Sequence, residues 1–293
     1  MSITLQSAFP VLNRLRVGRD LPILPLAILV PFVLVATFAN LIAPYDPTEP
    51  IPGAKIFEPP FWSNGGSMRA LLGTDYQSRD VLSRLIFGAR VSLIVGVTGT
   101  LVAGSIGTLL GMLSGYIGGW VDQLIMRITD AWLALPAIVF AIFLATMVGP
   151  SMWNIIIILG CVYWTRYARV IRGEVLSLRE REFVKLAEIA GAGRTRVILR
   201  HILPNVMNST MVLASLTIGV VIIAEASLSF LGVGVPPPQP AWGSMLADGR
   251  SMLMVGDWWL TISPGLGILL VVLATQLFGD WLRIRLDPQQ RNL

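Results

Sequence analysis

The chain has 293 residues, of which 54% are hydrophobic and only 13% are charged. Soluble domains carry about 25% charged residues, so this composition excludes an ordinary soluble protein and indicates a membrane protein. The net charge of +5 is concentrated in a few loops, which is the pattern of membrane topology and not of nucleic-acid binding.

Several segments contain no Asp, Glu, Lys or Arg and are long enough to cross a bilayer, for which about 20 apolar residues suffice. These segments are 21–45, 91–121, 131–165, 202–224 and 258–279. The third is broken by Gly149-Pro150 and is long enough for two short spans. The sequence therefore predicts an all-α integral membrane protein with six transmembrane helices. Their expected ranges are 21–45, 91–116, 131–148, 153–170, 208–231 and 258–279.

The segment before the first span carries Arg14, Arg16 and Arg19. Basic residues beside a span favour the cytoplasmic side, so we expect the first span to run from inside to outside. The apolar run that begins at Leu21 lacks a small-residue cleavage site. We therefore expect it to remain as a span and not to be removed as a signal peptide.

The next segment, 44–70, is rich in Pro and Gly and is expected to be irregular and external. After it, Val81, Leu82, Leu85 and Ile86 recur at helical spacing, with polar residues between them. This pattern predicts an amphipathic helix that lies at the membrane surface.

The second span is dense in glycine, and Gly107 and Gly111 form a small-xxx-small pair that permits the close approach of another helix. The third and fourth spans are expected to form a hairpin around Gly149-Pro150. Cys161, in the fourth span, has no second cysteine with which to pair, and we interpret it as a packing residue.

The segment 166–200 holds nine basic residues and is therefore expected to be cytoplasmic. Within it, apolar residues at helical spacing predict a short amphipathic helix over 182–190. Its apolar stripe is Phe183, Leu186, Ala187 and Ala190, and its polar face carries Glu182, Lys185 and Glu188. Gly191 and Gly193 are expected to end it with backbone angles that other residues resist. A second short helix is expected to begin near Thr195 and to stop before Pro204.

A helical hairpin of this size needs a docking partner, since isolated helices shorter than about 12–15 residues are marginal in water. The stretch resembles the cytoplasmic coupling loop of permease subunits of binding-protein-dependent ABC importers. The family pattern is Glu-Ala-Ala followed by a Gly and then by Ile-x-Leu-Pro. Here Lys185-Leu-Ala187 stands at the triplet, Gly191 is the glycine, and His201-Ile-Leu-Pro204 closes the segment. Lys185 and Leu186 therefore replace the Glu and the first Ala of the family pattern, and His201 stands in place of its Ile.

Two further stretches resemble permeases of the dipeptide, oligopeptide and nickel branch of that family. The first comprises Leu72-Gly-Thr-Asp75, Ser78-Arg-Asp80 and Gly88-Ala-Arg-Val-Ser-Leu93, with Ser78 where the branch usually has glycine. The second comprises Leu228-Ser-Phe-Leu-Gly232, the prolines 236–238 and Trp242-Gly243. Because of this resemblance, we expect the chain to be the second of the two permease subunits of that branch.

The fifth span contains Glu225, and an acidic residue at membrane depth is a candidate functional site by default. The structural alternative, which we favour, is a carboxyl group near the outer interface that is hydrogen-bonded to another helix or to a partner subunit. The sixth span is followed by Arg283 and Arg285, which favours a cytoplasmic position for both chain ends.

The sequence shows no catalytic or metal-binding constellation with credible spacing. His201 is the only histidine, and its place in the coupling-loop pattern favours a helix-end or docking role over that of a base. There is no Gly-x-x-x-x-Gly-Lys-Ser/Thr phosphate loop. The chain is therefore not expected to be an enzyme, and its energy must come from elsewhere.

The resemblance implies a type I ABC importer transmembrane domain in three regions. Residues 1–88 would hold the cytoplasmic N-terminus, the first transmembrane helix and the external segment. Residues 89–281 would form the core, with a cytoplasmic coupling loop at 171–207, and residues 282–293 a cytoplasmic tail. The residues expected to couple to an ATPase are Glu182, Phe183, Lys185, Leu186, Ala187, Ala190, Gly191 and Gly193.

The implied partners are a homologous permease in a heterodimer, two ATPase subunits, an external solute-binding protein and the lipid membrane. ATP and Mg would be bound by the ATPase subunits, with no cofactor in this chain. The expected location is the bacterial plasma (inner) membrane. The expected function is a translocation path for a small solute, with di- or oligopeptides as the first choice. The alternative is a secondary transporter or channel without ATPases, whose features would be paired discontinuous helices or several intramembrane charges.

Overall fold

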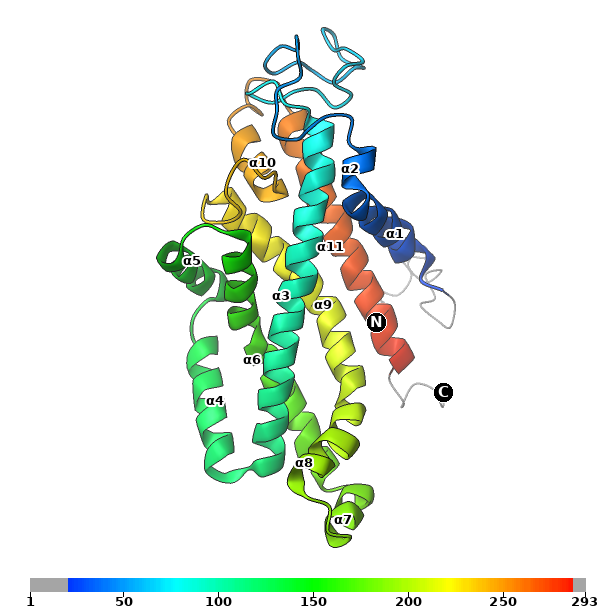
Figure 1. The fold of residues 1–293 in the computed structure, drawn as a ribbon, viewed down its shortest axis with the longest axis vertical. Coiled ribbons are helices and arrows are strands. Elements are labelled where there is room, and N and C mark those ends of the chain that lie inside the picture. Colours follow the sequence, from blue (N-terminus) through cyan, green and yellow to red (C-terminus); the bar gives the residue numbers. More distant parts are fainter. Residues whose placement is uncertain (1–20, 287–293) are drawn as a thin grey trace, which may run out of the picture.

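The structure is a computed structural model that describes residues 21–286 (Figure 1). Within these residues the chain is helical apart from loops and two isolated β-bridges, which confirms the predicted all-α class. The elements are α1 (Ile23–Thr37), α2 (Ala39–Ile42), α3 (Val81–Ile117), α4 (Gly119–Leu133), α5 (Ala137–Val148), α6 (Met152–Arg179), α7 (Glu182–Ile189), α8 (Arg194–Val197), the π-helical turn η3 (Ile198–Ile202), α9 (Leu203–Phe230), α10 (Trp242–Gly249) and α11 (Trp259–Leu286).

Four helical segments between residues 21 and 286 are long and apolar enough to cross a membrane: α3, α6, the continuous segment Arg194–Phe230 and α11. The pair α4–α5 adds a fifth if it is counted as one span, although its two helices are bent by 91°. α1 is shorter, with 15 residues. The chain is thus a multi-span helical membrane protein. The prediction of six spans, each formed by one helix, is wrong for 131–148.

The bend between α4 and α5 has a local cause in Pro136. A proline disfavours helical angles at the residue before it, and Pro136 itself is extended, with ψ of 122°. α4 therefore ends at Leu133 and α5 begins afresh at Ala137. The 12 residues of α5 are fewer than the about 20 that cross a bilayer.

α4 is an amphipathic helix that the sequence analysis does not predict, because that analysis follows uncharged runs. Two of its carboxylates bind arginines of α6: Asp122 lies 2.5 Å from Arg172, and Asp130 lies 2.5 Å from Arg169. These ion pairs fasten α4 along α6.

α3 and α6 pack closely where α3 carries Gly107 and Gly111. A Cβ on Gly107 would lie 2.2 Å from the carbonyl oxygen of Trp164, and a Cβ on Gly111 would lie 2.7 Å from that of Ala168. Any larger residue at either position would therefore push the helices apart. The close helix approach predicted from this glycine pair is confirmed, and the partner helix belongs to the same chain.

The segment 81–93 is the first part of α3, so the prediction of a separate amphipathic helix at the membrane surface is wrong. The helix begins after Asp80, whose carboxylate accepts hydrogen bonds from the amide and hydroxyl of Ser83 at 2.8 and 2.6 Å. Ser83 and Arg84 are buried, and Ser83 also accepts a bond from the amide of Tyr45. The polar positions of this segment therefore face the preceding loop.

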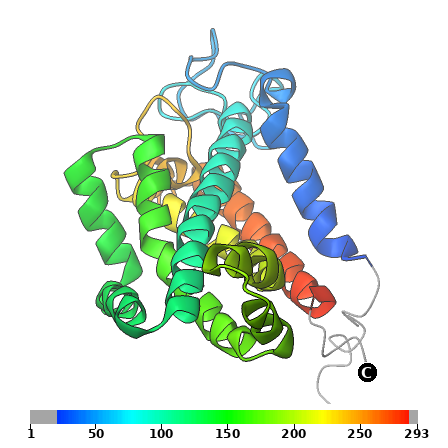
Figure 2. The ribbon, with the colours of Figure 1, turned by 60° about the horizontal axis from the view of Figure 1, so that its bottom comes forward.

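The two ends of the molecule differ. The irregular segment 43–80 and α10 lie at one end, called the loop end below, and α7 lies at the opposite end, called the α7 end (Figure 1). Figure 2 shows α1 at one edge of the helical bundle and α5 at the opposite edge. The long helices α3, α6 and α9 connect the two ends.

Candidate functional site

Val184 is the fully buried side chain of α7. Val184 packs in a cluster of buried residues from α3, α6, α8, η3 and α9. The other members are Met112, Tyr116, Ile171, Val175, Val197, Ile202 and Val206. Because this cluster joins the ends of three long helices, a displacement of α7 acts on all three. Val184 lies off the apolar stripe that helical spacing predicts, so that spacing does not identify it.

The remaining apolar surface of α7 is exposed. Phe183, Leu186 and Ile189 are 41%, 63% and 82% exposed. Ala190 is also exposed, and Ala187 is half-buried. The predicted stripe thus leaves its apolar groups uncovered by the described part of the chain, which is typical of a docking surface for another protein. The exposed face of α7, as named below, consists of Phe183, Leu186, Ile189 and Ala190.

Ile189 was not among the residues predicted for this site. It lies three residues after Leu186, and side chains at this spacing are neighbours on one helix face. This spacing is the signal that identifies it. Ile189 is the last residue of α7, so the exposed face reaches the end of the helix and continues to Ala190 directly after it.

The polar face of α7 makes two different contacts. The Tyr116 hydroxyl of α3 donates a hydrogen bond of 2.7 Å to Glu188 Oε1. Lys185 Nζ lies 3.0 Å from Glu180 Oε2, and this contact lowers the pKa of the Glu180 carboxyl. Glu182 lies in the first turn, where the helix dipole favours a carboxylate. Glu188 therefore links α7 to α3, whereas Lys185 is half-exposed in a surface ion pair.

Gly191 ends α7 as predicted. Its φ is +81°, in the left-handed region that glycine adopts without a Cβ clash. Its amide donates to the carbonyl oxygen of Glu188 at 2.9 Å, and the amide of Ala192 donates to that of Ala187 at 3.0 Å. These two bonds form a Schellman motif, which satisfies carbonyl groups that the helix end leaves free.

Gly193 does not have the predicted role. Its φ of −65° and ψ of 152° are angles that any residue adopts, and it precedes the first residue of α8. α7 ends at Ile189, four residues before Gly193, and the chain turns at Gly191.

The prediction that the second short helix stops before Pro204 is also wrong. α8 continues through the π-helical turn η3 into α9, and the amide of Leu203 donates to the carbonyl oxygen of Ile198. Pro204 lies in the first turn of α9, where a missing N–H is tolerated. His201 lies in the π-helical turn, and its carbonyl oxygen accepts a bond of 2.6 Å from Asn205 Nδ2. The α7 hairpin therefore leads directly into a long apolar helix.

Glu225 is fully buried in α9. Its Oε1 accepts a hydrogen bond of 2.7 Å from the Ser229 hydroxyl, whose oxygen accepts one of 3.2 Å from the amide of Val235. Glu225 Oε2 has no hydrogen-bond partner among the described residues. Within residues 21–286, the hydrogen-bond partner of Glu225 is a residue of its own helix and not one of another helix. The bond to a partner subunit stays a prediction. Through Ser229, the carboxyl group holds the loop that follows α9.

The motif around Asp75 forms a buried ion cluster at the loop end. Asp75 Oδ2 lies 2.7 Å from Arg79 Nε and 3.4 Å from Arg84 Nε, with all three side chains at most 7% exposed. Arg84 also lies 3.9 Å from Asp248 of α10. Buried charges are stable only when paired, so the removal of one partner is costly. The cluster fastens the loop to α3 and α10.

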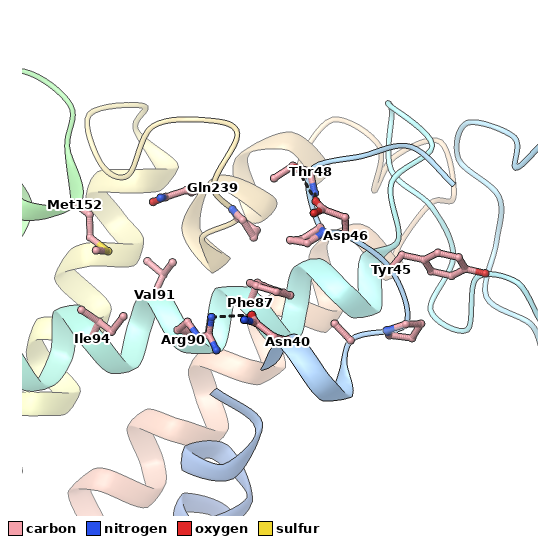
Figure 3. Close-up of a pocket in the computed structure, with 14 residues that line it drawn as sticks. Asn40, Tyr45, Asp46, Thr48, Phe87, Arg90, Val91, Ile94, Met152 and Gln239 are labelled. Atoms are coloured by element: carbon pink, nitrogen blue, oxygen red, sulfur yellow. Dashed lines mark hydrogen bonds between the residues drawn. The ribbon is translucent and has the colours of Figure 1, made fainter. Parts of the chain in front are cut away.

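Arg90 joins α1 to α3. Its Nε and Nη2 donate to the carbonyl oxygens of Ala36 and Thr37 at 2.9 and 3.0 Å, and its Nη1 donates to Asn40 Oδ1 at 3.0 Å. Figure 3 shows Arg90 in the wall of a cavity of about 750 Å³ at the loop end. Since each nitrogen of the guanidinium is bonded to the α1–α2 region, Arg90 is a structural cation and is not free for a ligand.

Known proteins resemble most of this chain. The model of the family described as binding-protein-dependent transport system inner membrane component matches residues 107–292. The dipeptide transport system permease protein DppC of Escherichia coli K12 is 44% identical over 89% of this chain and 86% of its own length. The di/tripeptide transport system permease protein DppC of Pseudomonas aeruginosa is 42% identical over 89% of this chain and 85% of its own. The dipeptide transport system permease protein DppC of Alkalihalophilus pseudofirmus is 40% identical over 93% of this chain and 87% of its own length.

Proposed function

The chain belongs to the family of inner membrane components of binding-protein-dependent transport systems, and on this basis we propose that it forms part of the translocation path for di- or oligopeptides in an ABC importer. The peptide assignment is supported by three relatives that are named for dipeptide or di/tripeptide transport. Each of them is covered by this chain over 85–87% of its length.

The observation that carries the mechanism is the exposed face of α7. In the proposed complex, two ATPase subunits bind ATP and Mg, and a groove on one of them receives Phe183, Leu186 and Ile189. Gly191 turns the chain away directly after this contact. The predicted coupling residues Glu182, Lys185 and Ala187 then lie beside the contact, and Gly193 only precedes α8.

Movement of the ATPases reaches the bundle through the inner side of α7. Val184 packs among residues of α3, α6 and α9, and Glu188 accepts the hydrogen bond from Tyr116 of α3. Close-packed interiors transmit displacement because their side chains have no free space into which to yield. The same helices extend to the loop end, where they enclose the path of the solute together with a homologous permease.

The proposed orientation places the α7 end in the cytoplasm, because the segment 166–200 carries nine basic residues. The loop end then lies outside the bacterial inner membrane, where the solute-binding protein docks. Both chain termini are cytoplasmic in this orientation.

The experiment that tests this function uses the complete importer in proteoliposomes. We expect uptake of radiolabelled dialanine or trialanine that requires both ATP and the solute-binding protein. If the importer takes up neither dialanine nor trialanine, the peptide assignment is overturned. Uptake driven by an ion gradient without the ATPase subunits would instead support a secondary transporter.

A further inference from the structure

A second cavity, of about 500 Å³, lies near the α7 end between α6, α9 and α11. An acid from α6, Glu174, and a base from α11, Arg283, both line it. Within residues 21–286 neither side chain forms an ion pair or a hydrogen bond. One cavity thus presents an unpaired carboxylate and an unpaired guanidinium that come from different helices.

Other polar side chains that line this cavity are suited to a peptide group. Asn208 and Ser209 of α9 line the cavity, and neither side chain has a hydrogen-bond partner among the described residues. An amide side chain offers both a donor and an acceptor, as a peptide bond requires. Leu213 and Leu216 supply an apolar wall next to them. The volume of this cavity is in the range of small-molecule binding sites, which is about 300–1,000 Å³.

We propose that this cavity is a transient binding site for a zwitterionic peptide near the cytoplasmic end of the path, with the ammonium group at Glu174 and the carboxylate at Arg283. This inference rests on the proposed function and adds the site within the permease. A lipid phosphate fits less well, because the Glu174 carboxylate repels an anion whereas it attracts an ammonium group.

The test is a calorimetric titration of the purified complex of permeases and ATPases, without the solute-binding protein, with dialanine, N-acetyl-dialanine and dialanine amide. We expect dialanine to bind and each blocked form to bind at least about tenfold more weakly, as the loss of a charge-assisted hydrogen bond implies. Glu174→Gln should weaken dialanine binding by a similar factor without further weakening N-acetyl-dialanine. Arg283→Gln should weaken dialanine binding by a similar factor without further weakening the binding of dialanine amide.

The matched control is Asp280→Asn, which removes an exposed charge on α11 outside the cavity and should leave binding unchanged. Size-exclusion chromatography checks that each variant complex is intact. The inference is overturned if dialanine does not bind the wild-type complex, if blocking its termini has no effect, or if Arg283→Gln only releases a co-purified anionic lipid.

Dialanine uptake by the complete wild-type importer separates this inference from the proposed function. Uptake without site-dependent binding overturns the cavity site alone. Failure to transport either dialanine or trialanine overturns the peptide assignment and the cavity site with it.

Discussion

At the scale of single residues, Gly191 decides the turn after α7. Its φ of +81° would cost a residue with a Cβ about 1–2 kcal/mol. A Cβ here would meet no atom of the described chain, so a steric clash arises only with a docked partner. We therefore expect Gly191→Asp to leave the subunit in the membrane while peptide uptake falls at least severalfold. Uptake and membrane content of the subunit are measured in the same cells.

The control for Gly191 is Lys185→Ala, since the Lys185–Glu180 pair is exposed and such pairs contribute only about 0–1 kcal/mol. Near-normal uptake is expected for this variant. Full transport by Gly191→Asp, or equal damage from Lys185→Ala, would show that the turn is not part of the coupling element.

Glu225 is a second residue whose role is decided by its contacts. Glu225→Gln keeps an acceptor for the Ser229 hydroxyl and should preserve assembly and most uptake. Glu225→Leu leaves that hydroxyl without its acceptor, at a cost of about 1–3 kcal/mol, and should lower the yield of assembled complex. Normal assembly with lost uptake in the Gln variant would instead assign Glu225 to the transport step.

At the scale of elements, the link between α7 and α3 is the hydrogen bond from Tyr116 to Glu188. Tyr116→Phe removes this bond and keeps the ring in its cluster. A bond to a charged group contributes about 1.5–3 kcal/mol, so we expect the variant to retain its ATPases but to transport severalfold less peptide per ATP hydrolysed. The measurement is uptake and ATP hydrolysis in the same proteoliposomes.

Glu188→Met, whose side chain lacks a carboxylate or amide acceptor, and the double variant complete a cycle that isolates this hydrogen bond. The effects of the two single changes should not add, because either change removes the same bond. Additive effects, or an unchanged ratio of uptake to hydrolysis in Tyr116→Phe, would mean that α7 acts on α3 by another route.

Sequence reasoning predicted α7 and its turn because helical spacing and a glycine that ends a helix are local signals. It missed Val184, because burial of that side chain depends on where the ends of α3, α6 and α9 meet. It ended the second helix before Pro204, because that rule assumes α-helical hydrogen bonding, whereas the chain forms a π-helical turn there. The bend at Pro136 went unpredicted, since an uncharged run does not show that a helix is broken.

At the scale of the whole molecule, the loop end and the α7 end should face opposite sides of the membrane. A reporter inserted near Asn64 should report the outside, and one fused after Arg181 should report the cytoplasm. The physical reason is the excess of basic residues in 166–200. Reporters on the same side would contradict the arrangement in Figure 1, in which the segment 43–80 and α7 lie at opposite ends of the bundle.

The central claim is that the exposed face of α7 binds an ATPase subunit. The direct measurement is the amount of ATPase that co-purifies with the subunit when Leu186 and Ile189 are both changed to Asp; these side chains are 63% and 82% exposed, so the change should not disturb the fold. The account predicts that this double variant keeps the homologous permease but loses most of its ATPase, whereas Glu182→Gln keeps both. Undiminished ATPase and normal peptide uptake in the double variant would contradict it.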